Sequence, residues 1–381
     1  MKISIMEILK NKKTQILVFL FVAIILWRIS LIFIPSDSGL YWWGALYQII
    51  ALYGAIFGFL IAKKWGGFKS AMGRTVLAFS FGLLLQSFGQ ATSSYYVYTT
   101  GTVPYPAIGD IGFFGSVLFY ITGVILLSRA SNIQSVFKSI SHKIRIIVLP
   151  LIMLGVSYWI FLIDYVFDWT NKTKVFLDFG YPLGQAFYVS VAILLLISTK
   201  KMWGGVMRKP IFFLLVALIA QYTSDFMFLY QSNNNTYVGG GSVDYMYFVS
   251  YFLMAFSLIY LSNVFHKIQS ESFQTATVKP ESGVITGIDK LLNQILVEII
   301  KRQEKVAGTL AWEEVKKVQA INIVDQTNFV ISVNGDVKEA INQLVLGFKN
   351  LFGDIAIDVS KNSVRYLTAE LPLDEVPSSL K

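Results

Sequence analysis

The chain has 381 residues, of which 55% are hydrophobic, 15% aromatic and 14% charged, and this composition excludes an ordinary soluble protein. The formal net charge is +9, but most of the excess Lys and Arg lies in short connections between apolar stretches. There it suits membrane orientation and anionic lipid head groups better than nucleic acid. The chain contains no cysteine, so disulfides, thiolate metal sites and a cysteine nucleophile are excluded.

Eight apolar stretches fill the first two thirds of the chain. A helix needs about 20 apolar residues to cross a hydrocarbon core of roughly 30 Å, and each stretch is about that long. They comprise residues 15–34, 42–62, 75–96, 107–128, 146–168, 178–198, 210–230 and 242–264. The sequence therefore predicts an all-α polytopic membrane bundle of eight transmembrane helices within residues 1–265.

The basic residues fall on alternate connections of this bundle. They precede the first stretch or follow the second, fourth, sixth and eighth, whereas the opposite connections carry only Lys172 and Lys174. Because Lys and Arg are retained on the cytoplasmic side, we expect both termini in the cytoplasm. The predicted location is the cell (inner or plasma) membrane, which the chain crosses several times.

The membrane region contains a candidate internal repeat at an offset of about 131 to 138 residues. The basic turn at residues 63–67 recurs at residues 200–205, and Asp110 corresponds to Asp244. These matches predict a 4+4 parallel duplication about an axis along the membrane normal. The alternative is that aromatic-rich membrane helices resemble one another by composition alone.

Several polar and aromatic side chains lie in the predicted outer part of the bundle, where ionisable groups are costly and therefore candidates for function. In one interpretation Asp110, Asp178 and Asp244 cap helix N-termini, Asp164 and Asp168 reach the outer head groups, and the tyrosines belong to an interfacial belt. Asp225 fits this less well, because it lies several residues before the end of its span. In the other interpretation an outward-facing pocket binds a ligand. Its candidate residues are Arg28, Gln90, Tyr105, Asp110, Tyr181, Gln221, Asp225 and Asp244.

Two inward-running helices open with similar phrases, Tyr105-Pro106-Ala107-Ile108-Gly109-Asp110 and Tyr181-Pro182-Leu183-Gly184-Gln185. They resemble the Tyr-Pro…Asp openings in multi-span input regions of bacterial and archaeal sensor proteins, which precede histidine kinase or diguanylate cyclase modules. The resemblance covers the third to eighth stretches at most. It implies a structural or sensing role for Asp110. The second copy departs from the pattern, because Gln185 stands where an acidic residue is usual.

The remaining residues lack the output module that such sensors carry. Neither His142 nor His266 is followed by an acidic residue, and no glycine-rich nucleotide lid or acidic metal-binding loop is present. Residues 266–284 are polar and contain Pro280 and Gly283, which predicts a linker.

Residues 285–381 predict a small cytoplasmic α+β domain. Its expected elements are an amphipathic helix over 285–305, a short helix near 311–319, a strand over 328–333 and a helix from Asp336 to about Phe352. Periodicity leaves open whether residues 354–370 form a strand followed by a helix.

These features predict a non-enzymatic integral membrane sensor that couples an outward-facing pocket to a cytoplasmic interaction domain. Its candidate partners are the lipid bilayer, a cytoplasmic protein that docks on residues 285–381, a second copy of the chain and a small ligand. No nucleic acid, metal or cofactor is expected. The alternative is a small-solute transporter or channel, which intramembrane Asp, Gln and Arg would also serve.

Overall fold

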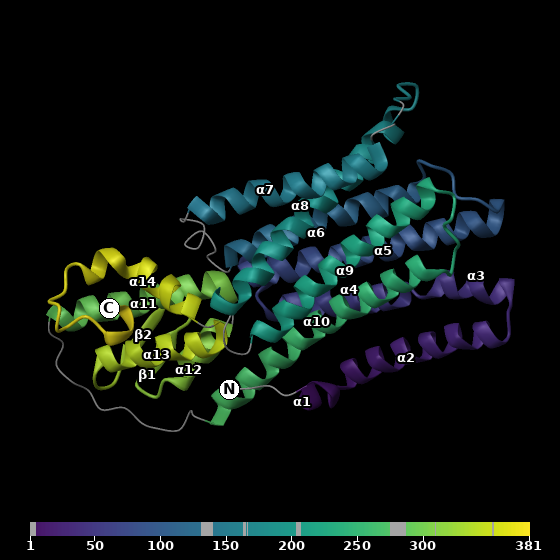
Figure 1. Cartoon of the computed structure of the whole chain (residues 1–381). Coiled ribbons are helices and arrows are strands. Elements are labelled where there is room, and N and C mark those ends of the chain that lie inside the picture. Colours follow the sequence, from purple (N-terminus) through teal and green to yellow (C-terminus); the bar gives the residue numbers. More distant parts are fainter. Residues whose placement is uncertain are drawn as a thin grey trace.

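The computed structural model describes residues 5–130, 140–162, 165, 167–202, 207–274, 287–308, 310–352 and 354–381. Long helices form an elongated bundle, and a small C-terminal domain lies against one end of it (Figure 1). We call the other end, where α10 begins, the distal end. The bundle elements are α1 Ile5–Leu9, α2 Lys12–Phe33, α3 Asp37–Leu46, α4 Ile49–Lys64, η1 Gly67–Lys69, α5 Ala71–Thr100, α6 Ile108–Ala130, α7 Ile140–Ser157, η3 Tyr158–Leu162, α8 Lys172–Met202, α9 Arg208–Asn233 and α10 Ser242–Gln274.

Seven helical segments of the described residues are long and apolar enough to cross a membrane, which confirms a helical multi-pass bundle. They comprise residues 12–33, 37–64, 71–100, 108–129, 172–197, 208–232 and 242–265. The expected span at 146–168 corresponds to α7 and the π-helical turn η3, whose apolar part, Val148–Ile160, is shorter. The helix ends at Leu162, before the predicted boundary. The count of eight spans and the duplication stay predictions.

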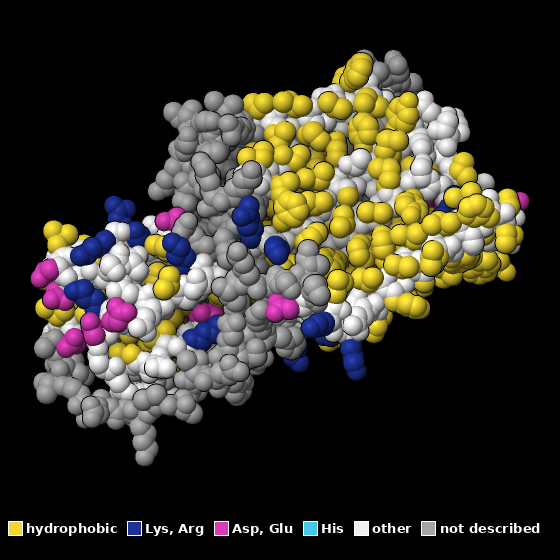
Figure 2. Space-filling model, turned by 60° about the horizontal axis from the view of Figure 1, so that its bottom comes forward, with side chains coloured by type: hydrophobic (Ala, Val, Ile, Leu, Met, Phe, Trp, Pro, Cys, Tyr) yellow, Lys and Arg dark blue, Asp and Glu magenta, His cyan; other side chains and the backbone are white. Residues whose placement is uncertain are grey.

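The side chains on the outside of the bundle are those expected against lipid. Phe19 of α2 and Trp159 of η3 are each 69% exposed. Apolar side chains cover much of the bundle on the face that Figure 2 shows. The α10 helix lies inside, packed against α2, α4 and α9. In its most apolar window 78% of residues are buried, compared with 11% in α2. The α10 helix is therefore the core of the bundle, and α2 is a peripheral helix.

The second span is interrupted where α3 meets α4. Tyr47 and Gln48 keep helical backbone angles, but the regular helix breaks off between α3 and α4. The Gln48 side chain stabilises this point, because its Nε2 donates to the Ala45 carbonyl oxygen at 3.0 Å. Its Oε1 accepts a hydrogen bond from Ser87 Oγ at 2.8 Å. A polar side chain thus satisfies a backbone carbonyl at the interruption and connects it to α5.

The C-terminal domain combines helices with one antiparallel hairpin, in which Ile321 pairs with Val333. The elements are α11 Gly287–Ala307, α12 Leu310–Lys317, β1 Ile321–Asp325, β2 Val330–Val333, α13 Val337–Phe352, α14 Asp354–Thr368 and η5 Ser378–Leu380. The amphipathic helix is confirmed, with Leu292 and Ile299 buried. The helix predicted after Asp336 is also confirmed as α13. Asp336 caps it, because its Oδ1 accepts a hydrogen bond from the Lys338 backbone N–H. The sequence left residues 354–370 undecided between a strand followed by a helix and other structure, and the structure has the helix α14 there. The strand β1 was not predicted.

The linker was predicted to begin at residue 266, but α10 continues as a helix to Gln274. Residues 266–274 contain neither Gly nor Pro, so nothing in this stretch interrupts the helix. The rest of the predicted linker lies outside the described residues.

The C-terminal domain packs directly on the end of the bundle, through α12 against α10 and α11 against α5. Two glycines with positive φ, Gly66 and Gly308, bring backbone against backbone. A Cβ on Gly308 would lie 2.4 Å from the Trp65 carbonyl oxygen. The Trp65 side chain is fully buried there and meets the Phe265 ring of α10 at a centroid distance of 6.1 Å. We call this contact of Trp65, Gly66, Phe265 and Gly308 the junction.

Candidate functional site

Tyrosine hydroxyls bind each described carboxylate on the bundle helices that sequence analysis singled out. At the distal end, Tyr181 donates to Asp110 Oδ1 at 2.9 Å. Tyr105 and Tyr165 donate to the two oxygens of Asp178, each at 2.7 Å. Because a phenol hydroxyl can donate one hydrogen bond, these pairs supply donors to the oxygens of both carboxyl groups.

The N-terminal capping interpretation is right for Asp110 and Asp244 and wrong for Asp178. Asp110 is the third residue of α6, and its Oδ2 accepts a hydrogen bond from the Ala107 backbone N–H at 2.7 Å. Asp244 is the third residue of α10, and its Oδ2 accepts from the Gly240 N–H at 2.6 Å. Asp110 therefore acts as the N3 residue of a capping box, whereas Asp244 binds the residue before the N-cap. In contrast, α8 begins six residues before Asp178, and Asn171 caps it by accepting from the Lys174 N–H.

Asp168, which we expected at the outer head groups, closes a turn after η3. Thr170 donates to it through its hydroxyl and its backbone N–H. These hydrogen bonds stabilise the charged form and lower the pKa of Asp168 below its ordinary value. The other aspartate of this segment named by sequence analysis, Asp164, lies outside the described residues.

Arg28 and Asp244 meet at the same glycine instead of forming an ion pair with each other. Arg28 Nε donates to the Gly240 carbonyl oxygen at 3.0 Å, and its guanidinium lies 5.8 Å from the Trp43 ring centroid. The Asp244 carboxylate is 2% exposed and also accepts from the Tyr237 hydroxyl at 3.0 Å. In the loop between α9 and α10, the carbonyl and the N–H of Gly240 are therefore both hydrogen-bonded to side chains.

A second polar group lies deeper, among α6, α8, α9 and α10. Asp225 is 7% exposed and accepts hydrogen bonds from Tyr188, Tyr247 and Gln221 at 3.0, 2.9 and 3.1 Å. Gln221 in turn accepts from the Ser250 hydroxyl at 2.9 Å. The fully buried Tyr120 ring lies 5.9 Å from that of Tyr188. We call this group the central polar cluster: Tyr120, Tyr188, Gln221, Asp225, Tyr247 and Ser250.

Aromatic contacts connect the central polar cluster with the distal end. Tyr247 stacks on Tyr251, and Tyr251 stacks on Tyr47, each with ring centroids 6.1 Å apart. Tyr47 is a hydrogen-bonding neighbour of Asp244. The Tyr251 hydroxyl also donates to Gln86 Oε1 at 2.9 Å, and Gln86 Nε2 donates to Ser116. A continuous polar and aromatic path therefore runs along one face of α10.

The eight candidate residues lie in separate groups. Gln221 contacts Asp225, Tyr181 contacts Asp110, and Gly240 connects Arg28 with Asp244. Gln90 donates to the Gly44 carbonyl oxygen of α3, and Tyr105 binds Asp178. Whether any of these groups binds a ligand stays a prediction.

Sequence analysis named Tyr105 and Tyr181 but missed the other tyrosines that complete these groups. A signal was present on α10, because Asp244, Tyr247 and Tyr251 follow one another at i, i+3 and i+7 and share one helix face. Tyr188 and Tyr237 carry no such local signal, because only the packing of different segments brings them to a carboxylate. Over the described residues, no group of three or more His, Cys, Asp or Glu side chains could hold a metal ion.

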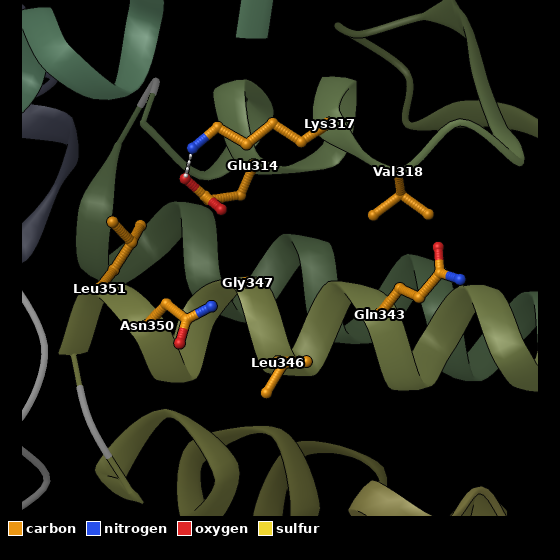
Figure 3. Close-up of a pocket in the computed structure, with 8 residues that line it drawn as sticks. All are labelled: Glu314, Lys317, Val318, Gln343, Leu346, Gly347, Asn350 and Leu351. Atoms are coloured by element: carbon orange, nitrogen blue, oxygen red, sulfur yellow. Dashed lines mark hydrogen bonds and ion pairs between the residues drawn. The ribbon is translucent and has the colours of Figure 1, made fainter. Parts of the chain in front are cut away.

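The C-terminal domain has a groove of about 490 Å³ between α12 and α13 (Figure 3). An ion pair of Lys317 with Glu314, at 2.7 Å, forms one side of it. The other side is mostly apolar and includes Leu346, which is 56% exposed. The α13 side also carries the polar side chains of Gln343 and Asn350, so the groove combines apolar and polar groups.

No known protein family, curated protein or solved structure matches this chain. The resemblance to sensor input regions therefore rests on the two Tyr-Pro phrases alone.

Proposed function

We propose that the protein is a non-enzymatic membrane sensor in which α10 couples the polar groups of the bundle to the C-terminal domain. The proposal rests on one observation: the same helix carries residues of the polar and aromatic path and also contacts the C-terminal domain. The α10 helix carries Asp244, Tyr247 and Tyr251, and its other end contacts α12. A displacement of this buried helix would therefore reach the C-terminal domain.

In this proposal a stimulus acts by favouring one of two arrangements of the hydrogen bonds on α10. A stimulus shifts such an equilibrium only by its differential interaction with the two states. The tyrosine hydroxyls are suited to this, since a hydroxyl can donate or accept and rotates freely. By the distribution of Lys and Arg, the distal end would face outward and the C-terminal domain the cytoplasm. An unidentified cytoplasmic protein would receive the output.

The absence of cysteine from the chain allows a direct test. We would place spin labels at Phe68→Cys beside the junction and Val324→Cys in the hairpin, where the native side chains are 76% and 67% exposed. The distance between the labels would be measured in the full chain in lipid nanodiscs. Tyr251→Phe removes the hydrogen bond to Gln86 and should shift or broaden the distance distribution.

Tyr105→Phe is the matched control, because it removes a hydrogen bond to Asp178 on α8, outside the α10 path. It should leave the distance unchanged. If Tyr251→Phe also leaves the distance unchanged while the protein remains folded, coupling through α10 is wrong. The transporter alternative would then be tested by solute flux into liposomes.

A further inference from the structure

The central polar cluster contains a buried carboxylate without a counter-ion. Asp225 is the eighteenth of the 26 residues of α9, far from both helix ends. Within the part of the chain that the structure describes, Asp225 forms no ion pair with Lys, Arg or His. A charged carboxylate that is buried without a cation is costly, and a neutral carboxylic acid avoids most of that cost.

Among the described residues, the titratable groups that interact with Asp225 from the packed elements are all tyrosines. They are Tyr120 of α6, Tyr181 and Tyr188 of α8, Tyr222 of α9, and Tyr247 and Tyr251 of α10. A tyrosine is neutral at physiological pH, so none of these neighbours compensates a negative charge. They can only hydrogen-bond to it, as Tyr188 and Tyr247 do, and the Gln221 amide is a third donor.

Tyr120 supplies the second, independent observation. Its hydroxyl is buried and has no hydrogen-bond partner among the described residues. A buried hydroxyl without a partner is rare and costs free energy. The Tyr120 ring meets the Tyr188 ring edge-on at an interplanar angle of 70°, and Tyr188 is itself a donor to Asp225. The residue with the unused hydroxyl therefore packs, ring against ring, on one of the donors to the carboxylate.

We propose that the central polar cluster reversibly binds a proton on Asp225, and that Tyr120 is the reserve hydrogen-bond acceptor of the protonated state. A proton from water forms an O–H bond at Asp225 Oδ2, and the carboxylate becomes neutral. That O–H then donates to Tyr188 Oη, which reverses the present hydrogen bond. Because the Tyr188 and Tyr120 hydroxyls are not hydrogen-bonded in the structure, the Tyr188 side chain must also shift to bring its hydroxyl within reach of Tyr120 Oη. It then donates to Tyr120 Oη, and the buried phenol oxygen gains a hydrogen bond as an acceptor.

The proton would be the stimulus, or part of it, for the coupling proposed above, and this consequence rests on the proposed function. Because Tyr247 lies on α10, a change in its hydrogen bond to Asp225 acts on the helix that reaches the C-terminal domain. Proton binding itself does not depend on that coupling.

The test is infrared titration of the carboxylic acid C=O band in the full chain. Detergent micelles without ester groups keep the band clear of lipid carbonyls. The Asp225→Asn variant identifies the band by subtraction. The wild-type protein should show a band that depends on Asp225 and disappears between about pH 4 and about pH 9. A band that is absent throughout, or that persists unchanged throughout, overturns reversible protonation.

Two tyrosine variants should move the midpoint in opposite directions. Tyr120→Phe removes the reserve acceptor and the unpaired hydroxyl, so it should lower the midpoint by about one pH unit. Tyr247→Phe removes a donor to the charged carboxylate, so it should raise the midpoint by a similar amount. Tyr105→Phe, which contacts Asp178, should not move it. A shift in the same direction for both central variants, or no shift for Tyr120→Phe, contradicts the role of Tyr120.

The spin-label distance separates this inference from the proposed function. If the band titrates while the distance between labels at residues 68 and 324 is the same at both extremes of pH, the proton site holds and the coupling fails. If the distance responds to Tyr251→Phe but the band does not titrate, the coupling holds and the proton site fails.

Discussion

The two ends of α10 are held in different ways. At the distal end and along the bundle, side-chain hydrogen bonds hold the helix, through Asp244, Tyr247 and Tyr251. At the junction, apolar rings and a close approach of backbone to backbone hold the adjoining segments, with Gly308 against Trp65. Hydrogen bonds between hydroxyls and carboxylates can be exchanged for others, whereas two backbones in contact cannot slide without separating. The difference suggests an adjustable end coupled to a rigid one.

The largest effect is expected from removing the acceptor of the central polar cluster. Asp225→Leu leaves the buried donors of Tyr188, Tyr247 and Gln221 without their partner. Each unsatisfied buried donor costs about 1–3 kcal/mol, so the free energy of unfolding should fall by roughly 3–5 kcal/mol. Thermal unfolding in detergent measures this loss. Asp225→Asn keeps one carbonyl acceptor and should cost less; equal losses would contradict this account.

The second largest loss of stability is expected at the junction, from Gly308→Ala. Gly308 ends α11 with φ of +63°, and its N–H donates to the Glu304 carbonyl oxygen. A Cβ there is strained by roughly 1–2 kcal/mol and would also collide with the Trp65 carbonyl oxygen. We expect a loss of about 2–3 kcal/mol, with faster proteolysis of α11 and α12 in the full chain.

The matched control for the junction is Gly287→Ala at the start of α11. Nothing lies within 4 Å of a Cβ added to Gly287. This variant should leave both stability and proteolysis unchanged. If Gly308→Ala behaves like it, the junction is looser than the backbone contact indicates.

A smaller effect should distinguish the two capping aspartates. Asp244→Ala removes the carboxylate that accepts hydrogen bonds from Gly240 and Tyr237, and Asp244 is 2% exposed. Asp110→Ala removes the carboxylate that accepts hydrogen bonds from Ala107 and Tyr181, and Asp110 is more exposed than Asp244. Loss of a cap costs about 1 kcal/mol, and the deeper burial of Asp244 should add to that. Equal losses in thermal unfolding would show that burial does not separate the two caps.

Much of this fold follows from local sequence signals, and most of the site does not. Apolar length predicts the spans, and amphipathic periodicity predicts α11 and α13, because both depend on residues close in the chain. The cap at Asp178 was predicted wrongly, since the helix begins earlier, behind Asn171. The Tyr188 and Tyr237 contacts depend on packing between different segments. Local spacing contains no record of that packing.

The smallest effect is expected in the hairpin of the C-terminal domain, away from the α10 path. Asp325 accepts hydrogen bonds from the Asn328 side chain and from the backbone N–H groups of Thr327 and Asn328. These bonds, that of the Asn328 side chain first, hold the pKa of Asp325 below its ordinary value. The folded hairpin therefore favours the charged carboxylate. Its contribution to stability is complete above the unfolded pKa of about 4 and is lost as the pH falls through the lowered folded value.

Asp325→Asn keeps an acceptor in the turn but cannot change its charge. Hydrogen exchange of residues 321–333, corrected for the intrinsic effect of pH, should become faster at low pH in the wild-type protein and should not change with pH in this variant. Gln326→Ala, at an exposed position in the same turn, should behave like the wild-type protein. Because Asp325 lies at the protein surface and is only partly buried, water screens the effect and keeps it small. If the pH response of hydrogen exchange persists in Asp325→Asn, another group causes it. If Asp325→Asn also changes hydrogen exchange at the distal end, the hairpin is not separate from the α10 path.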